Sequence, residues 1–337
     1  MIRKKCNDLV LTCYKNKDKL DAPEDIKKRG IITHAKNNRV LCGSVQGSMD
    51  YEAFKHNNPD AHRIIVEESI DGTLVNMFYH NHSWQLSTKR TPNAFHSYWL
   101  SSKSFGHIFM ETIERSLDVS LLNKNNSYSF VLQHPECRNV SPVQMGVVYH
   151  IATYDCTLHK YIQCNIGTLK PYIYSCFYSY DSIEHFVNDL PFYREGVVLY
   201  SKDRQEHCKL KGKRFMFVKS VKGNVPCKEE TCLRAYRNKQ IHTFLYYFPE
   251  FQSIWMKLHK TMSRTIHMLH SLYVSKKIKK ENVSTSSKCK QILYDIHGIY
   301  LKTRKRIKKE TIYNYLLDTY SSAHLIELFH EFSKFVV

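Results

Sequence analysis

The texture of the sequence changes once, near residue 228, and this change constrains the fold more than any other feature. Residues from about 62 to 225 carry short apolar or alternating runs separated by turn residues, a pattern typical of β-strands. After residue 228, apolar residues recur at intervals of three and four, as on one face of an α-helix. We therefore expect an α+β chain, with antiparallel sheets and flanking helices in residues 1–227 and an all-helical domain in residues 228–337.

The same patterns predict individual elements. The expected strands are residues 39–45, 63–66, 74–79, 84–87, 128–132, 146–151, 196–200 and 214–218. Asn81-His82 predicts a hairpin turn between two of these strands, and the apolar spacing within residues 104–122 predicts a helix. In the second domain we expect a long helix around residues 254–273 and two more helices near residues 287–306 and 310–333.

The charge of the chain points to a polyanionic partner. The net charge is +19, and Lys and Arg near phosphates release condensed counterions. Residues 228–337 hold 20 Lys and Arg against 9 Asp and Glu, a difference of +11. The densest runs contain Lys276, Lys277, Arg304 and Arg306, which we expect to contact RNA. The alternative for these runs is a solvated helical face.

Cysteine use and hydropathy indicate the environment. The 11 cysteines lack tight repeats, and no apolar run follows Met1, so free thiols in the cytoplasm or another reducing compartment are expected. No stretch approaches the 18 apolar residues of a membrane span. A zinc site of His207, Cys208, Cys227 and Cys232 is disfavoured, because the paired short spacings of such sites are missing.

Three ordered segments carry the residues that indicate a chemistry. The first is Ser69-Ile-Asp-Gly72, followed by an alternating strand and the basic pair Lys89-Arg90. The second is the strand over residues 128–132, which runs into a turn that contains proline. The third is Glu195-Gly-Val-Val, followed about twenty residues later by residues 215–220.

In this order and spacing, the segments resemble the motifs of covalent nucleotidyltransferases, and phage-type RNA ligases above all, over residues 35–225. In that family, a lysine in Lys-x-Asp-Gly attacks the α-phosphate of ATP or GTP as the neutral amine. Acidic groups on facing strands bind the divalent metal and the ribose, and two lysines in the last strand offset phosphate charge. The resemblance implies a nucleotidyltransferase fold with nucleotide and RNA as partners.

Most positions keep the pattern of that family. The matching residues are Asp71, Gly72, Glu195 and Lys219, with Lys89 or Arg90 at the basic position after the first hairpin. The resemblance implies that these residues bind a nucleotide, such as ATP with Mg²⁺ or Mn²⁺, and that Glu195 is the metal ligand.

Three positions depart from the pattern. The lysine position holds Ser69, and the glutamate expected on the middle strand falls on Val131, with Gln133 two residues later. The first lysine expected in the last strand falls on Phe217. Together these losses predict a preserved scaffold that has lost its covalent chemistry.

A serine does not simply replace the lysine, because a hydroxyl is a poor nucleophile unless a base removes its proton. His80 and His82 are expected to be exposed at the hairpin turn, away from Ser69. A lysine displaced from elsewhere, such as Lys89 or Lys219, is the alternative nucleophile.

Three functions follow as hypotheses. The leading one is an RNA-ligase-like pseudoenzyme that binds RNA or a nucleotide, and its departures from the family pattern resemble those of ligase-like proteins of large DNA viruses. The second is an active ATP-dependent RNA ligase that joins 5′-phosphate and 3′-hydroxyl ends through a relocated lysine. The third is a non-catalytic scaffold whose basic helical domain docks on a protein. Under the first, Ser69→Lys alone restores little activity, because Val131 and Phe217 remain.

Overall fold

The computed structural model describes residues 2–13, 30–175 and 177–333. The chain divides into two compact units, Met1–Ser220 and Val221–Val337. The boundary predicted from the sequence fell a few residues later, between residues 227 and 228. Among the described residues, no helix is both long enough and apolar enough to span a membrane.

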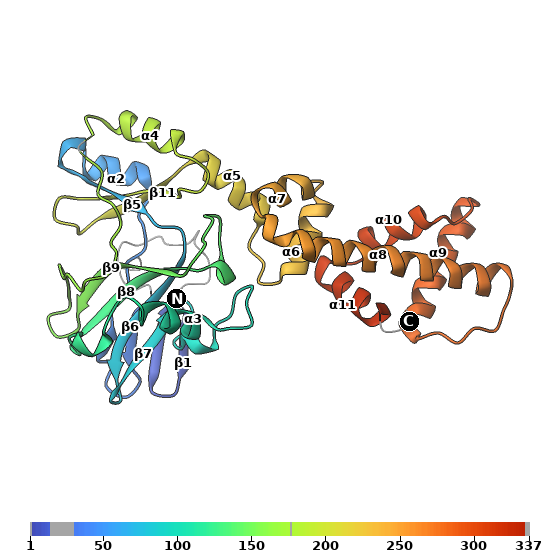
Figure 1. Cartoon of the computed structure of the whole chain (residues 1–337), viewed down its shortest axis with the longest axis horizontal. Coiled ribbons are helices and arrows are strands. Elements are labelled where there is room, and N and C mark those ends of the chain that lie inside the picture. The colour runs from blue at the N-terminus through green and yellow to red at the C-terminus, as the bar shows by residue number, and fades with distance from the viewer. Residues whose placement is uncertain (1, 14–29, 176, 334–337) are drawn as a thin grey trace. The chain divides into compact units, whose positions relative to one another are not determined.

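The described residues of the first unit form three antiparallel sheets, and short helices flank two of them (Figure 1). A four-stranded sheet has the order β1 (Ile2–Cys6), β2 (Leu9–Cys13), β3 (Ile32–His34), β4 (Val40–Cys42). A five-stranded sheet has the order β10 (Lys160–Ile162), β9 (Val147–Asp155), β8 (Asn126–Gln133), β6 (Thr73–His80), β7 (Ser83–Thr88). A three-stranded sheet has the order β12 (His207–Lys211), β11 (Gly196–Tyr200), β5 (Ile65–Ser69).

Successive side chains of a strand point to opposite faces of its sheet, and the two faces pack against different neighbours. In the five-stranded sheet, one face packs on α3 (Phe105–Ile113), whose Phe105, Ile108 and Phe109 are buried there. In the three-stranded sheet, Val66, Val197 and Leu199 pack on α2 (Tyr51–Asn57) and α4 (Tyr180–Asp189). Residues of the opposite faces, such as Val198 and Val131, line the space between these two sheets. Phe78, on that face of β6, packs instead against Leu11 and Ile32 of the four-stranded sheet.

The helices of the second unit surround α8 (Gln252–Tyr273), which packs against four of the others. The other α-helices described for this unit are α6 (Lys228–Arg237), α7 (Ile241–Tyr247), α9 (Ser287–Thr303), α10 (Lys309–Thr319) and α11 (Ser322–Ser333). Of these, α6, α9, α10 and α11 pack against α8. The buried Leu258, Met262 and Ile266 confirm the predicted apolar face of α8. The helix predicted over residues 310–333 is two helices, because Tyr320 is extended and the Ser321 hydroxyl accepts the His324 N–H at the start of α11.

Most predicted strands of the first unit are confirmed, and so is the hairpin turn. Asn81 and His82 both have positive φ, of 49° and 61°, as a tight turn between β6 and β7 requires. The helix predicted over residues 104–122 is shorter, since α3 ends at Ile113. The fold class predicted from the sequence, antiparallel sheets with flanking helices and a helical C-terminal region, is confirmed.

One prediction is wrong in a way that matters for the site. Residues 214–218 are not a strand but belong to α5 (Lys213–Lys222), because the buried Phe215, Val218 and Val221 are three residues apart. The last strand is instead β12, which pairs with β11 so that Lys211 lies opposite Gly196. Cys208 is buried in the core on one side of β12, and Lys209 and Lys211 lie on the other side.

Candidate functional site

A cavity of about 850 Å³ lies in the first unit, between the free faces of the three-stranded and five-stranded sheets. Val131 and Leu74 contribute apolar surface from one sheet, and Val198 and Tyr200 from the other. The cationic residues that line it are Lys4, Lys89, Arg90, Lys209, Lys211 and Lys219, and the acidic ones are Glu67, Glu68, Asp71 and Glu195. A flat apolar group between the sheets, with anionic groups beside the lysines, would suit this lining.

Ser69 lies at the end of β5, directly opposite Gly196 in the register of β11. The side chain is 3% exposed, and its hydroxyl donates a hydrogen bond of 2.8 Å to Oε2 of Glu195. The position that resembles the family's nucleophile therefore holds a buried hydroxyl bonded to a buried carboxylate.

Two lysines of β12 surround this pair. Nζ of Lys211 forms an ion pair of 2.6 Å with Oε1 of Glu195. Nζ of Lys209 donates to the Ser69 hydroxyl over 3.4 Å. A lysine at position 69 would reach past the serine hydroxyl, and the Lys209 amine lies 3.4 Å from that hydroxyl.

The electrostatics of Glu195 follow from these contacts. Burial raises the pKa of its carboxyl, but the Lys209 and Lys211 ammonium groups and the hydrogen bonds that the carboxylate accepts outweigh burial and lower the pKa to about 2. A carboxylate with so low a proton affinity is a weak base. It therefore does not activate the Ser69 hydroxyl by taking its proton.

Both carboxylate oxygens of Glu195 have partners, which bears on the metal role predicted for this residue. Oε1 pairs with Lys211 and Oε2 accepts from Ser69. A divalent cation at Glu195 would lie close to the Lys211 ammonium. The carboxylate thus holds Lys211 and the Ser69 hydroxyl, and the role of Glu195 as a metal ligand stays a prediction.

Lys209 and Lys211 were missed by the motif assignment, which took the last strand to be residues 214–218. Phe217 and Lys219 lie on α5 instead, where Phe217 is about half exposed and Lys219 lines the cavity. The last strand, β12, therefore carries two lysines rather than one. Their signal in the sequence is the alternation Lys-Leu-Lys, shortly after Glu195-Gly-Val-Val.

Asp71 and Gly72 shape the wall of the cavity. Oδ2 of Asp71 accepts the backbone N–H groups of Val140 and Ser141, at 2.8 and 2.9 Å, which fixes that loop. A Cβ atom on Gly72 would lie 2.5 Å from the Leu132 carbonyl oxygen, so only glycine fits where the chain passes β8. Asp71 lines the cavity, but the hydrogen bonds that its carboxylate accepts hold the loop in place.

The remaining predicted positions also line the cavity. Val131 faces it from β8, whereas the nearby Gln133 donates to the Asp71 carbonyl oxygen at 2.8 Å. Lys89 and Arg90 follow β7, and Lys4 reaches the Arg90 carbonyl oxygen at 2.7 Å. The structure thus brings the predicted first-unit residues to one cavity, with the exception of Ser69, which lies beneath it beside Glu195, and Phe217, which is not part of its lining.

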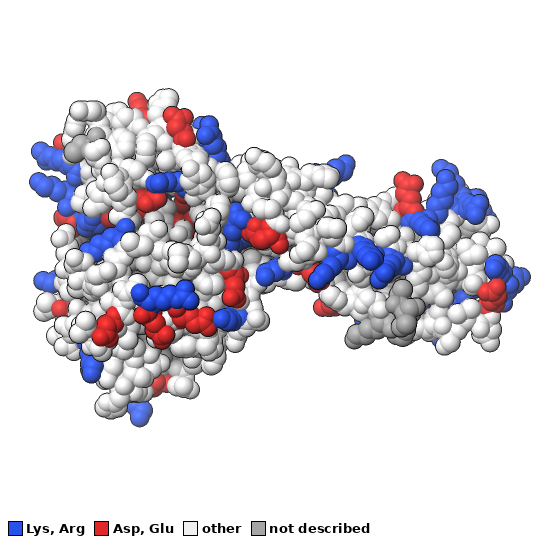
Figure 2. Space-filling view, in the orientation of Figure 1, with Lys and Arg blue, Asp and Glu red and all other residues white. Residues whose placement is uncertain are grey.

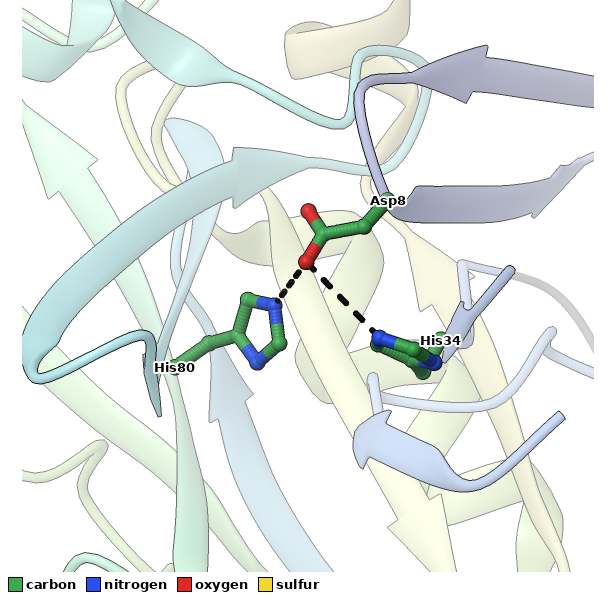
Figure 3. Close-up of side chains that lie close together, drawn as sticks. All are labelled: Asp8, His34 and His80. Carbon is green, nitrogen blue, oxygen red and sulfur yellow. Dashed lines mark hydrogen bonds and ion pairs between the residues drawn. The ribbon is translucent and has the colours of Figure 1, made fainter. Parts of the chain in front are cut away.

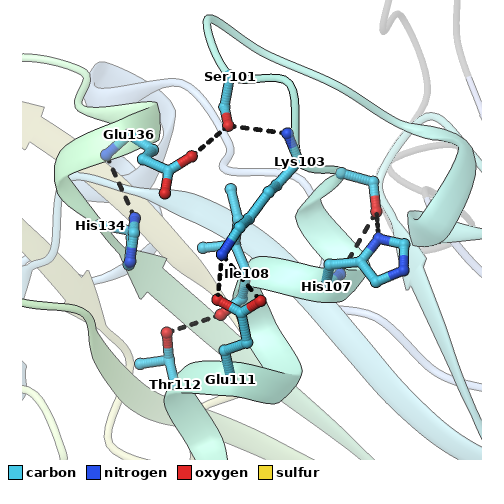
Figure 4. Close-up of polar contacts among 9 residues, drawn as sticks. Ser101, Lys103, His107, Ile108, Glu111, Thr112, His134 and Glu136 are labelled. Carbon is cyan, nitrogen blue, oxygen red and sulfur yellow. Dashed lines mark hydrogen bonds and ion pairs between the residues drawn. The ribbon is translucent and has the colours of Figure 1, made fainter.

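Polar contacts fix the loop that contributes Tyr98 and Trp99 to the cavity (Figure 4). The Ser101 hydroxyl bonds to Glu136, and the Lys103 ammonium bonds to Glu111 of α3 at 2.8 Å. Because these contacts tie the loop to α3 and to the turn after β8, the aromatic rim of the cavity is held in place.

His207 is a buried histidine on the cavity wall that the motif analysis did not use. Burial, with the positive charge of Lys89 and Lys209, lowers its pKa to about 4, so the ring is neutral near pH 7. The histidine expected to be exposed at the hairpin, His80, is instead partly buried and bonded to Asp8 at 2.7 Å.

We expect Glu195→Gln to change the acid stability of the protein. The pKa of Glu195 is about 2 in the fold and its ordinary value is 4.5, so the carboxylate stabilises the fold above pH 4.5. This contribution, about 3 kcal/mol by linkage, is lost as the pH falls from 4.5 towards 2. Urea unfolding should therefore show a large deficit for the variant at pH 7 that shrinks on acidification. The exposed Glu52→Gln variant is the control, and an equal deficit at both pH values would contradict the assignment.

Comparison with known proteins bears on this arrangement. No family model matches the chain. In sequence it is 28% identical over 270 residues to an immediate-early protein ICP-46 homolog of Invertebrate iridescent virus 6, covering 72% of this chain and 59% of that protein. It is 22% identical over 273 residues to a putative bifunctional polynucleotide kinase/RNA ligase of Autographa californica nuclear polyhedrosis virus, covering 74% and 38%. The chain resembles RNA ligases.

The resemblance predicted from the motifs is thereby confirmed, and both relatives are viral. The chain spans less than two thirds of the length of either relative. Among solved structures, two mutants of a Naegleria gruberi RNA ligase with ATP and Mn match at 12% and 11% identity, with TM-scores of 0.38 and 0.41. These matches cover 48% and 53% of this chain, and 53% and 57% of theirs.

Proposed function

We propose that this RNA-ligase-like protein binds a nucleoside triphosphate without forming a covalent nucleotide intermediate, and binds RNA through its basic helical unit. The observation that carries the first part is the Ser69 hydroxyl, which donates to Glu195 at the position of the family's lysine. A phosphoramide bond needs an amine nitrogen there. The serine has none, and Glu195 is too weak a base to activate its hydroxyl.

The cavity supports non-covalent binding of a nucleotide. Lys209 and Lys211 present two ammonium groups at one wall, and Lys89 and Arg90 line another part. Ammonium and guanidinium groups form charge-assisted hydrogen bonds with phosphate oxygens. The apolar surface between the sheets suits a base. The viral relative described as a putative polynucleotide kinase/RNA ligase is in keeping with a nucleotide ligand, and we take ATP as the ligand to test.

The second candidate is an active RNA ligase that uses Lys209. Its amine lies 3.4 Å from the Ser69 hydroxyl, at the position that resembles the family's lysine. To attack the α-phosphate, this amine would have to lose a proton and give up its hydrogen bond to Ser69. Incubation with α-labelled ATP and Mn²⁺ separates the candidates. If the wild-type protein is stably labelled and the Lys209→Met variant is not, the result supports the active ligase. If the wild-type protein is not labelled, the result supports the binding protein.

The RNA-binding part rests on the charge of the second unit, over which Lys and Arg side chains are spread in Figure 2. Lys277, Arg304 and Arg306 are exposed, while Lys276 is partly buried and donates to Thr285 at 2.7 Å. The His270 ring bonds to the Ile307 carbonyl oxygen at 3.3 Å, so the chain after α9 lies against α8. The basic run that contains Arg304 and Arg306 therefore lies close to α8, and the run that contains Lys276 and Lys277 directly follows that helix.

We expect the replacement of Lys276, Lys277, Arg304 and Arg306 by Gln to weaken binding of single-stranded RNA. The slope of log K against log salt concentration should fall by roughly 0.7 for each phosphate that is no longer neutralised. Fluorescence anisotropy over a salt series measures this slope. The matched control replaces four exposed cations of the first unit, Lys5, Arg115, Lys160 and Lys202. If both sets of replacements weaken RNA binding equally, the binding follows net charge alone, and the proposal that the second unit binds RNA is contradicted.

A further inference from the structure

Asp8, His34 and His80 come together at one point of the first unit, although they are far apart in the sequence (Figure 3). Asp8 lies in the turn between β1 and β2, His34 ends β3, and His80 ends β6. Nε2 of His80 lies 2.7 Å from Oδ2 of Asp8, and Nε2 of His34 lies 3.8 Å from the same oxygen. One ligand atom from each residue lies within 4.8 Å of the others.

We propose that these three residues form a binding site for a divalent transition-metal cation of the Zn²⁺ class. Zinc bonds of about 2.0–2.1 Å in a tetrahedral arrangement place ligand atoms about 3.3 Å apart. The separations of 2.7 and 3.8 Å lie on either side of this value, so small side-chain movements complete the geometry. Three protein ligands leave the fourth position to water.

The donor set selects the class of cation. Two imidazoles with one carboxylate suit Zn²⁺, Co²⁺ or Ni²⁺, whereas Mg²⁺ and Ca²⁺ prefer oxygen ligands only. The Asn81 amide donates to Oδ2 of Asp8 at 3.1 Å and so orients the carboxylate. Binding displaces the proton shared by His80 and Asp8. The other ring nitrogen of His34, Nδ1, accepts the Lys36 N–H at 3.3 Å, a long hydrogen bond that a change of ring tautomer would break.

The position of the site indicates what the cation would do. Leu11 and Ile32 of the four-stranded sheet are buried with Phe78 of β6, so the two sheets pack against each other here. A cation bound by Asp8, His34 and His80 would join the same two sheets by coordination bonds. None of these ligands is among the described residues that line the nucleotide cavity, so this site is independent of the proposed function.

The test uses the full chain, freed of metal by a chelator and kept reduced. Competition with a chromophoric chelator should give one tight Zn²⁺ site, and Zn²⁺ but not Mg²⁺ should raise Tm by several degrees. His34→Gln and His80→Gln should each weaken Zn²⁺ binding at least tenfold, in line with removal of a ligand. His82→Asn, on the same hairpin at a positive φ that Asn tolerates, should leave Zn²⁺ binding unchanged.

The cysteines of the chain make a second measurement necessary. Co²⁺ bound by imidazole and carboxylate gives weak visible bands, whereas cysteine thiolate ligands add intense charge-transfer absorption. Weak bands without that absorption in the wild type support the site even if a histidine variant fails to fold. Absence of a tight Zn²⁺ site, unchanged Zn²⁺ affinity in both folded histidine variants, or a thiolate spectrum would overturn the proposal.

Discussion

Ser69→Lys is expected to turn a nucleotide-binding protein into one that captures the nucleotide covalently. The new amine would lie next to Glu195, with the ammonium groups of Lys209 and Lys211 close by. Neighbouring cations favour the neutral form of an amine, which is the form that attacks phosphorus. Intact-mass measurement after incubation with ATP and Mn²⁺ should show addition of one adenylyl group to a large share of the variant.

This expectation reverses the one drawn from the sequence. The sequence pattern puts Phe217 at the first of two lysine positions in the last strand and keeps Lys219 at the second. Because Phe217 belongs to α5 and β12 carries Lys209 and Lys211, that loss does not exist. Val131 remains as the departure on the middle strand.

Ser69→Met is the matched control, since its side chain also extends towards the cavity but has no amine, and it should form no adduct. If folded Ser69→Lys protein binds ATP and stays unmodified, serine is not the decisive departure. Adduct formation by the double variant Ser69→Lys, Val131→Glu would then assign the block to the missing carboxylate.

Lys209→Met is expected to reduce the affinity for ATP by about ten- to a hundredfold, the effect of losing one charge-assisted hydrogen bond of about 1.5–3 kcal/mol. This variant keeps the ion pair between Lys211 and Glu195 but removes the other ammonium group that offsets the burial of Glu195, so the fold should lose some stability. Lys211→Met should weaken ATP binding similarly. It also leaves the buried Glu195 carboxylate without its closest cation, which destabilises the fold.

Isothermal titration with ATP measures these affinities, and urea unfolding of the same samples separates the loss of binding from the loss of stability. The control is Lys202→Met, because Lys202 is exposed outside the cavity. Unchanged affinity of Lys209→Met protein would mean that ATP binds elsewhere or not at all.

The sequence predicts elements well where burial follows one period. Leu258, Met262 and Ile266 are buried at helical spacing on α8, and Val148 and His150 are buried in alternation on β9, and both elements are predicted from the sequence. The fold class follows from these patterns. Pairing partners, sheet order and packing between sheets do not, since they depend on contacts between residues far apart in the chain.

Prediction failed at residues 207–222, for a physical reason. The face of β12 that lines the cavity carries His207, Lys209 and Lys211, so the strand lacks an apolar run. The apolar cluster of α5 imitates a strand because the exposed Met216 and Phe217 fill the gaps between buried positions. A strand that carries charged site residues is thus harder to recognise than a helix that exposes apolar ones.

The motif order did identify Ser69 and Glu195, which lie in hydrogen-bond contact although 126 residues separate them. The motif order could not identify Lys209, whose amine lies beside Ser69. Likewise, Asp8, His34 and His80 come from separate parts of the first unit with no recognisable spacing, and only the packing of two sheets brings them together.

The most direct test is the intact mass of the wild-type chain after incubation with ATP or GTP and Mn²⁺. A hydroxyl bonded to Glu195 cannot form a phosphorus–nitrogen bond, so the mass should stay that of the unmodified polypeptide. A gain of one nucleotidyl group that peptide mapping assigns to Lys209, or to any other lysine, would contradict this account and identify the protein as a ligase with a relocated nucleophile.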